Sequence, residues 1–421
     1  MTHSTFSRRL EATDANQTGR HGGAFVKFPF NPKEVCILTV HFSSMELSDR
    51  RKAVAAELAD RGLDGLLMFR QESMYYLTGY DTFGYVFFQC LYMGADGETM
   101  TLLTRTPDLR QARHTSVIED IRLWHDAEGV NPAEDLRRIL AEHGLGGKRL
   151  GIETDAYGLT GFNLKRMEAA FGSFCELVEA SDLVTRLRMV KSPAEIEYVR
   201  EAARLADLGL DRAADVAAPG AFEGDVLAAL QGAIFKGGGD FPANDVIIGS
   251  GPRALLFRSA TGMRRMDQVD QLSLEWAGSY RHYHAAMMRT IAVGEASDYQ
   301  CSLHSAVREA IEAMTEALSP GRPVGEVDDA HRRVLDDAGL KEHRFAACGY
   351  ALGTTFSPNW MDKPMLYSGN PVLAKPGMVF FLHCIVTDSD RGIAMSLGYT
   401  CLVTDDGREV LSKRPLDFIV V

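Results

Sequence analysis

The sequence lacks long apolar runs and any segment typical of export. Its apolar runs, such as 65–69 and 379–382, are only a few residues long, whereas a helix that crosses a bilayer needs about 20 apolar residues. The first 30 residues contain arginines and polar residues but no continuous apolar stretch of the kind found in signal peptides. These absences predict a cytoplasmic protein that neither spans nor binds a membrane.

Positive charge is also in short supply. Lysine and arginine number 45 against 57 aspartates and glutamates, which gives a net charge of −12. A protein that binds nucleic acid non-specifically needs a basic face to displace counterions from phosphates. The charge therefore argues against a nucleic-acid partner and favours a small-molecule substrate.

Cysteines are few and scattered. There are seven, an odd number, and none has the CxxC spacing that marks a structural zinc site or a redox pair. The pattern predicts neither a disulfide framework nor a cysteine-based metal site. We expect reduced thiols that lie mostly in the core.

Length and composition indicate a globular protein of two or three domains. The 421 residues are 46% apolar and 24% charged, the balance of soluble globular chains. Residues 1–44 are less periodic than the rest and are expected to form an N-terminal arm of unknown role. A first domain is expected over 45–190 and a second over 191–421.

The first domain alternates strands and helices. Helical spacing over 46–60 ends near Gly62 and is followed by the apolar run 66–69 of a buried strand. This alternation predicts a small α/β domain. Further strands are expected at 86–92, 100–103 and 150–152, and helices at 131–143 and 161–171.

The second domain opens with a strong helix start. Ser192 and Pro193 precede a long helical pattern, and Glu195 completes a capping box with Ser192. Two successive sets of helices followed by strands indicate an internal pseudo-duplication. Helices are expected at 194–217, 223–235, 299–318 and 324–338, with strands at 246–248, 271–276, 288–293, 378–385 and 400–404.

Several motifs, in their order and spacing, resemble the creatinase, aminopeptidase P and methionine aminopeptidase superfamily. The resemblance covers roughly 45–421 and implies an α+β protein: a small creatinase-like N-terminal α/β domain followed by a catalytic pita-bread domain, assembled as a homodimer. The motifs are MYYLTGY (74–80), RMVKSPAEIEYVREAARLAD (188–207), SG (250–251), EWAGSYRHYHAAMMRT (275–290), PGRPVGEV (320–327), CGYALG (348–353), KPGMVFFLHC (375–384) and CLVTDDGREVLS (401–412).

The resemblance also implies which positions would hold metal in the peptidases of that superfamily. These enzymes bind two divalent ions through two aspartates, one histidine and two glutamates, because a water-activating dinuclear centre needs several hard anionic ligands. The corresponding positions here are Glu275, Ala286, Tyr350, His383 and either Gly398 or Tyr399. Alanine and glycine have no side-chain donor, so the sequence predicts no metal and no cofactor.

The pattern is more similar to the metal-independent creatinase and ectoine hydrolase branch. The stretches 275–278, 280–284, 349–353 and 356–360 match that branch. One departure concerns a histidine that both branches carry before the first ligand position, where this chain has Phe257 and Arg258.

Four residues are predicted to be catalytic. Glu275, at the end of an apolar run, is expected to be half buried with a raised pKa and to act as base or nucleophile. His282 and His284 are expected to alternate on a strand and face one side, with His284 the stronger candidate for moving protons. His383 and Tyr350 are expected to share the cavity of Glu275. The competing interpretations are a structural carboxylate paired with Arg289, ordinary strand histidines, and a lost site filled with polar packing.

Further residues are predicted to bind substrate. Asp240 and Asn244 follow a glycine-rich stretch that equally suits a plain flexible turn. Trp276 and Trp360 are expected to wall an apolar pocket, although aromatic residues at such spacing also suit a core. Arg105 and Arg110 are expected to form a carboxylate clamp reached across a dimer, or else to be solvated at the surface. Arg258 is the last of the residues predicted to bind substrate.

The favoured function is a metal-independent hydrolase of a C–N bond other than a peptide bond, in a small zwitterionic nitrogen compound such as an ectoine-like cyclic amidine. One alternative is an Xaa-Pro-type metallopeptidase with Glu275, His284 and His383 as an altered ligand set. The other is a non-catalytic protein that binds small molecules on the same fold.

Overall fold

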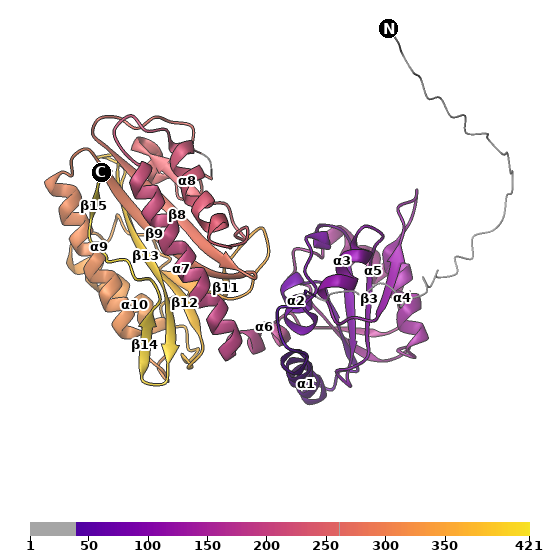
Figure 1. Cartoon of the computed structure of the whole chain (residues 1–421). Coiled ribbons are helices and arrows are strands. Elements are labelled where there is room, and N and C mark those ends of the chain that lie inside the picture. Colours follow the sequence, from indigo (N-terminus) through magenta and orange to yellow (C-terminus); the bar gives the residue numbers. More distant parts are fainter. Residues whose placement is uncertain (1–38, 261) are drawn as a thin grey trace, which may run out of the picture. The chain divides into compact units, whose positions relative to one another are not determined.

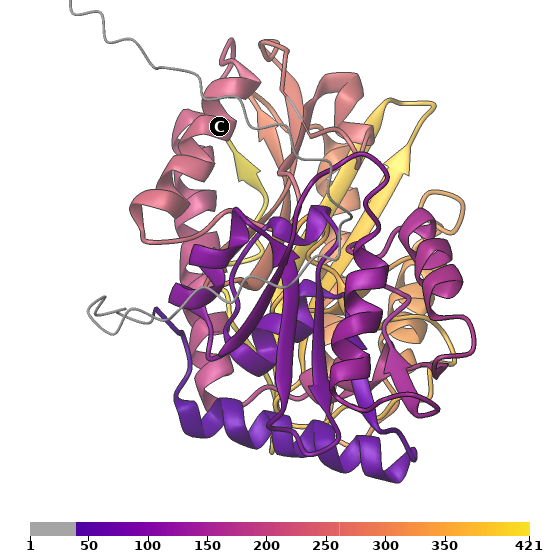
Figure 2. The same cartoon turned by 90° about the vertical axis from the view of Figure 1, so that its right-hand side faces the viewer.

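Short strands and helices alternate through the first half of the chain, as predicted. The computed structural model describes residues 39–260 and 262–421, so the predictions for residues 1–38 of the arm lie outside it. The first sheet runs in the order β4-β3-β2-β1-β5-β6. Its strands are drawn in purple shades in Figure 2. β1 pairs antiparallel with β2 and parallel with β5. The strands are β1 Gly65–Met68, β2 Cys90–Gly94, β3 Met100–Arg105, β4 Asp120–Trp124, β5 Arg149–Ile152 and β6 Glu176–Glu179.

Helices flank this sheet, and three of them were not predicted. The prediction of a strand from residue 86 was wrong at its start, because Gly84–Val86 forms a 3-10 turn and β2 begins only at Cys90. Val86 is 61% exposed, so this segment is not a buried strand. The unpredicted helices are α2, α3 and α6. From residue 39 onward, the helices of this half are α1 Ser44–Asp60, α2 Gln71–Thr78, α3 Asp108–Thr115, α4 Pro132–Glu142, α5 Gly161–Phe171 and α6 Asp182–Arg188.

The second half folds around a larger sheet. Its order is β11-β10-β12-β13-β9-β8-β7, with β14 paired to β13 and β15 to β9 (Figure 1). Two long antiparallel hairpins, β8–β9 and β12–β13, lie side by side in the middle of this sheet. The strands are β7 Ile247–Ser250, β8 Asp270–Tyr280, β9 Tyr283–Val293, β10 Gly349–Ala351, β11 Asp362–Met365, β12 Val379–Asp388, β13 Ile393–Thr404, β14 Gly407–Val410 and β15 Ile419–Val420.

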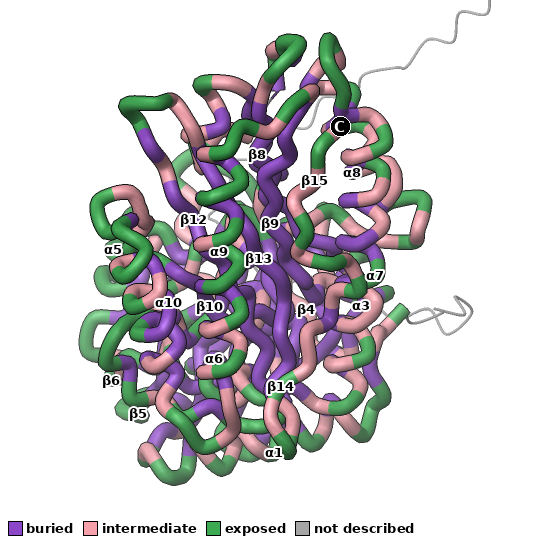
Figure 3. The backbone as a smooth tube through the Cα atoms, turned by 90° about the vertical axis from the view of Figure 1, so that its left-hand side faces the viewer, coloured by how far each residue is buried: buried purple, intermediate pink, exposed green. Residues whose placement is uncertain are grey.

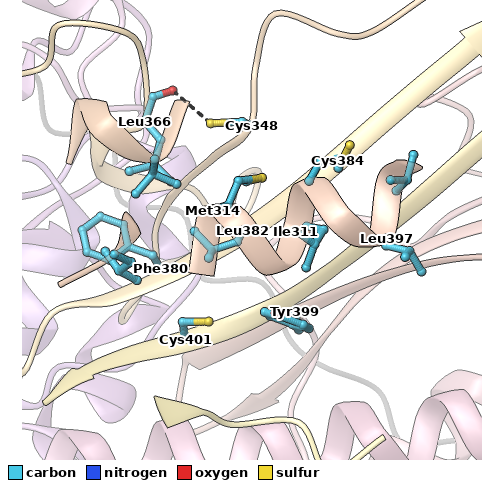
Figure 4. Packing of buried hydrophobic residues seen from close by; sticks show 14 of the residues in the cluster. Ile311, Met314, Cys348, Leu366, Phe380, Leu382, Cys384, Leu397, Tyr399 and Cys401 are labelled. Carbon is cyan, nitrogen blue, oxygen red and sulfur yellow. Dashed lines mark hydrogen bonds between the residues drawn. The ribbon is translucent and has the colours of Figure 1, made fainter. Parts of the chain in front are cut away.

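Each long hairpin packs against one pair of helices. α7 (Pro193–Val216) and α8 (Glu223–Lys236) contribute to one apolar cluster with β8 and β9. α9 (Asp298–Ala317) and α10 (Gly325–Asp337) contribute to another with β12 and β13 (Figure 4). The central strands are buried along almost their whole length (Figure 3). This arrangement agrees with the predicted repeat of two helices followed by strands.

The first long helix of this half begins as predicted. The Ser192 hydroxyl accepts a hydrogen bond from the Glu195 backbone N–H at 3.3 Å, and the Glu195 carboxylate accepts one from Ser192 N at 2.9 Å. Both halves of the capping box are therefore present. Such reciprocal bonds satisfy backbone donors that the first helical turn leaves without partners.

The β8–β9 hairpin turns through two residues in the left-handed region. Arg281 has φ 51° and His282 has φ 64°, the backbone that a tight two-residue hairpin turn requires. The expectation that His282 alternates with His284 on a strand is therefore wrong, since His282 lies in the turn. The turn contacts the first half of the chain: Tyr75 donates to Arg281 O at 3.0 Å, and the His282 imidazole lies 3.0 Å from the Asp81 carboxylate.

The expectation of free thiols that lie mostly in the core agrees with the described residues. Cys90, Cys348, Cys384 and Cys401 are buried free thiols, and Cys301 is exposed. Within residues 39–260 and 262–421, no helix combines the length and apolar character that a membrane crossing requires.

Candidate active site

Glu275 is held on the inner face of the large sheet by strand alternation. It lies in the middle of β8, opposite Met288 of β9 and Ile247 of β7, and only 9% of it is exposed. Successive residues of a strand point to opposite faces, so its neighbour Trp276 points the other way. The Trp276 indole N–H donates to Ala206 O of α7 at 3.0 Å. Trp276 and Trp360 belong to different apolar clusters, so the expectation that they wall one pocket is wrong.

A chain of hydrogen bonds leads to the Glu275 carboxylate. The Trp360 indole N–H donates to the Tyr350 hydroxyl at 2.8 Å, and that hydroxyl lies 3.5 Å from Glu275 Oε1, the outer limit of a hydrogen bond. Trp360 precedes β11 and Tyr350 lies on β10. Because the indole nitrogen can only donate, the hydroxyl proton is free to point toward the carboxylate. The structure thus brings together three of the predicted site residues.

Burial sets the protonation of this group. Removal from water raises the pKa of Glu275 to about 7, while the charge of Arg258 and the Tyr350 hydroxyl act in the opposite direction. Burial and the neighbouring Glu275 raise the pKa of Tyr350 well above its ordinary value. Glu275 is therefore divided between its charged and neutral forms near neutral pH, and Tyr350 keeps its proton. Such a carboxyl group suits general base catalysis.

His383 lies beside this chain on β12. Its ring centre is 5.8 Å from that of Tyr350, in an edge-to-face arrangement. It is 5% exposed, and its Nδ1 has no hydrogen-bond partner among the described residues. Burial, together with the charge of His331, lowers the pKa of His383 to about 3. The imidazole is therefore neutral at physiological pH and offers both a donor and an acceptor.

His284 differs from His383 because both of its ring nitrogens are engaged. Its Nε2 accepts a hydrogen bond from Ala243 N at 2.9 Å, and its Nδ1 lies 3.1 Å from the Thr355 hydroxyl. A backbone N–H can only donate, so the ring proton belongs on Nδ1. Burial lowers the pKa of His284 to about 3. These bonds favour a positioning role over the predicted role in proton transfer.

The loop after α8 packs against the hairpin turn. The Asp240 carboxylate accepts a hydrogen bond from His282 N at 3.3 Å, and Asp240 N donates to Ser279 O at 2.9 Å. Asn244 is half-buried one residue beyond Ala243. The described contacts of Asp240 are with the end of the hairpin, which favours the interpretation of this segment as an ordered structural turn.

The two arginines predicted to clamp a carboxylate lie in the first half of the chain. Arg105 forms an ion pair with Asp126 at 2.5 Å, and its guanidinium lies 4.0 Å from the centre of the Phe87 ring. Arg110 is exposed on α3. Neither contacts Glu275 within the described chain.

Two cavities lie against the segment that carries Trp360. One of about 460 Å³ is lined on one side by Phe356 and Met361 and on the other by side chains of the first half, including Arg70 and Glu72. A second of about 450 Å³ shares Phe356 and includes His282. Glu275 is not among the residues that line either cavity.

The donor set does not suit the dinuclear centre of the related peptidases. Ala286 is buried and pairs with Ala277 across the hairpin, so it brings no ligand. A side chain at Gly398 would begin 2.8 Å from the Phe381 ring and 3.0 Å from His383 Cβ, which is closer than real contacts of this kind. The space that a second glutamate would need is filled. Glu275, Tyr350 and His383 alone do not supply the anionic ligands that two divalent ions require.

Comparison with known proteins identifies both halves of the chain. Residues 50–190 match the model of the creatinase/prolidase N-terminal domain, and residues 197–405 match that of metallopeptidase family M24. An ectoine hydrolase of Halomonas elongata is 27% identical over 91% of this chain and 99% of its own length.

Solved structures agree with these matches. The dipeptidase PepE of Mycobacterium ulcerans is 26% identical, with a TM-score of 0.77 over 90% of this chain and 99% of that one. A prolidase of Thermococcus sibiricus has a TM-score of 0.81 at 21% identity, over 90% of this chain and 100% of that one. The predicted creatinase-like domain followed by a pita-bread domain is therefore confirmed.

Proposed function

The chain belongs to the creatinase and aminopeptidase P superfamily of pita-bread hydrolases, and from this premise we propose that it is a metal-independent hydrolase. Its substrate would be a small zwitterionic nitrogen compound with a hydrolysable C–N bond, and an ectoine-like cyclic amidine is our first choice. The observation that carries the proposal is the Trp360–Tyr350–Glu275 chain in a site where Ala286 and Gly398 provide no ligands. The similarity to an ectoine hydrolase supports it.

The proposed reaction uses groups of this chain alone. Glu275 removes a proton from water, and the hydroxide oxygen adds to the amidine carbon. Tyr350 donates a hydrogen bond to the charge that develops in the adduct, a donor whose strength gains from burial. The proton held by Glu275 then passes to the leaving nitrogen as the C–N bond breaks, with neutral His383 as the neighbouring donor and acceptor. The hydroxyl proton of the adduct passes to the freed amine as the amide carbonyl forms, and the carboxylate is regenerated. The ring opens to a single product that has gained the oxygen and both hydrogens of water.

The metallopeptidase alternative requires Glu275, His284 and His383 to share an ion. His284 does not suit that role, because its Nε2 accepts from Ala243 N and its Nδ1 is bound to Thr355. Peptides must also be tested as substrates, because the chain is similar to a dipeptidase. A homodimer remains our expectation, and Arg105 and Arg110 would then face the partner rather than their own Glu275.

The test is a turnover screen of one preparation with ectoine, creatine and Xaa-Pro dipeptides, followed by nuclear magnetic resonance. Each reaction is run before and after treatment with chelator, and again with added manganese. We expect ring opening of a cyclic amidine at a rate that chelator does not change. Hydrolysis of a dipeptide that needs added metal would refute the proposal in favour of a peptidase. A rise in melting temperature without consumption would instead indicate a binding protein.

A further inference from the structure

A second group of buried polar side chains lies between α10 and the start of β10. Asp328 and His331 are one turn apart on the inner face of α10, and Cys348 directly precedes β10. Each of the three is 0% exposed. One ligand-type atom from each residue can be chosen so that all lie within 4.8 Å of one another. Three different metal-binding side chains thus meet in a space without solvent.

The polar atoms of this group lack the partners that burial normally demands. Within the described chain, both ring nitrogens of His331 lack a hydrogen-bond partner. Oδ1 of Asp328 lacks one as well. The Cys348 thiol lies 3.9 Å from Leu366 O (Figure 4) and beside the Asp328 carboxylate. Buried polar groups in native proteins are almost always bonded, and an exception requires an explanation such as an ion.

The other oxygen of Asp328 is fixed from outside the group. Oδ2 accepts hydrogen bonds from Arg332 Nε at 2.5 Å and from Ser368 N at 2.9 Å. The carboxylate is therefore held with Oδ1 beside His331 Nδ1, 3.7 Å away. Outer partners that orient a ligand in this way are a regular feature of metal sites.

We propose that Asp328, His331 and Cys348 bind a divalent transition-metal ion, with zinc the ion that fits these donors. Thiolate, imidazole and carboxylate together are typical zinc ligands. Bond lengths of about 2.0–2.3 Å in a tetrahedral site put its ligand atoms roughly 3.3–3.8 Å apart, and the distance between Asp328 and His331 falls in that range. An ion would be bound by one ring nitrogen of His331, Oδ1 of Asp328 and the Cys348 sulfur together.

This site is separate from Glu275 and has a structural purpose. Cys348 belongs to the apolar cluster of α9 and α10, whereas Tyr350, two residues later, belongs to the cluster on the inner face. The ion would join α10 to the strand that carries Tyr350. Cys348 O also accepts a hydrogen bond from His383 N at 3.0 Å. The inference does not rest on the proposed function, since it concerns metal content and stability and not turnover.

The experiment measures metal in the purified full-length protein by mass spectrometry after gel filtration in metal-free buffer. We expect about one zinc per chain, or uptake of one on titration of chelator-treated protein. Saturating zinc should raise the melting temperature of that protein by roughly 5 °C or more. Cobalt in place of zinc should give the ultraviolet charge-transfer band of a cobalt–thiolate bond, which shows a cysteine ligand in the unmutated protein.

Variants assign the ion to this group. H331N and C348S should reduce stoichiometric binding to a small fraction and abolish the zinc-dependent rise in melting temperature. C384S and H304N are the matched controls, because Cys384 and His304 are buried on neighbouring elements outside the group, and they should keep the ion. If H331N or C348S fails to fold, the cobalt spectrum of the unmutated chain decides. Absence of stoichiometric uptake and of the thiolate band, or unchanged metal content in H331N, would overturn the inference.

Discussion

Two buried glutamates, Glu153 beside the first sheet and Glu275 in the second, have similar surroundings but different bonding. Burial raises the pKa of both to about 7. The Glu153 carboxylate accepts hydrogen bonds from Phe69 N at 3.1 Å, Arg70 N at 2.9 Å and the Ser73 hydroxyl. Within the described chain, the Glu275 carboxylate has one hydrogen-bond partner, the Tyr350 hydroxyl at 3.5 Å.

The difference separates a carboxylate that holds a fold from one that is available for chemistry. Glu153 fixes the turn between β1 and α2, and its acceptor positions are occupied by the protein. Glu275 keeps acceptor capacity for water or a substrate. A raised pKa therefore does not identify a catalytic residue unless the bonds that surround it are counted as well.

The largest effect is expected from E275Q. Loss of the general base should lower turnover by about 10²–10⁴-fold, while the neutral amide removes the cost of a buried charge. We therefore expect equal or greater thermal stability than the unmutated protein at pH 8. The loss of activity is measured as turnover of the substrate found in the screen. The stability is measured by thermal unfolding of the same samples. Retention of activity would remove Glu275 from the mechanism.

Y350F tests the donor that Glu275 shares with the substrate. Removal of the hydroxyl should lower turnover by about 10²-fold, the usual loss for one donor to a developing charge. Trp360 would lose its acceptor, so W360F is the control that removes the same bond from the other side. We expect W360F to be much less damaging. Equal losses for the two variants would indicate that the bond between them, rather than the hydroxyl, matters.

E153Q should have the opposite profile to E275Q. Replacement weakens charge-assisted bonds to two backbone N–H groups, which should lower the free energy of unfolding by about 1–3 kcal/mol. Turnover per folded molecule should stay unchanged. Urea unfolding followed by circular dichroism gives the first quantity. If E153Q and E275Q change stability and turnover alike, the comparison between the two glutamates fails.

Titration of Glu275 should make the stability of the protein fall, and its activity rise, as the pH increases toward 7. Because its folded pKa of about 7 lies above its ordinary value of 4.5, the folded state binds the proton more tightly. The stability that this group contributes is thus full below pH 4.5 and is lost as pH rises through about 7, a change of about 3 kcal/mol. Activity should fall about tenfold for each pH unit below 7. The stability difference between E275Q and the unmutated protein, followed from pH 4.5 to 8, isolates this group.

The sequence predicts the frame of the molecule well, because long periodic segments carry their own signal. The capping box at Ser192 and Glu195 and the second-half helices lie within a few residues of their expected positions. Each hairpin strand overlaps its expected range, although β9 and β13 begin well before it, and the short strands β10, β11, β14 and β15 were missed. Short helices such as α2 and α3 were missed because eight residues show little periodicity. The turn at Arg281 and His282 was missed because it contains neither glycine nor asparagine, the usual signals of such a turn.

The candidate site was predictable in part. Glu275, Tyr350 and His383 follow from motif positions, and strand alternation alone would have separated Trp276 from Glu275. The bonds that occupy His284 come from Ala243 and Thr355, residues distant in sequence that carry no signal of their own. The group of Asp328, His331 and Cys348 was also missed, because a cysteine without CxxC spacing gave no indication of partners on the preceding helix.

The contact between the β8–β9 turn and Tyr75 and Asp81 has a consequence for recombination among relatives. Exchange of the first domain alone would bring a foreign surface against Arg281 and His282, and the transplanted half would lose the partners that hold this turn. We therefore expect a chimera to fold only when the β8–β9 turn and the first domain come from the same relative. The first domain and the β8–β9 turn must then be exchanged together, although some 200 residues separate Tyr75 from Arg281 in the sequence.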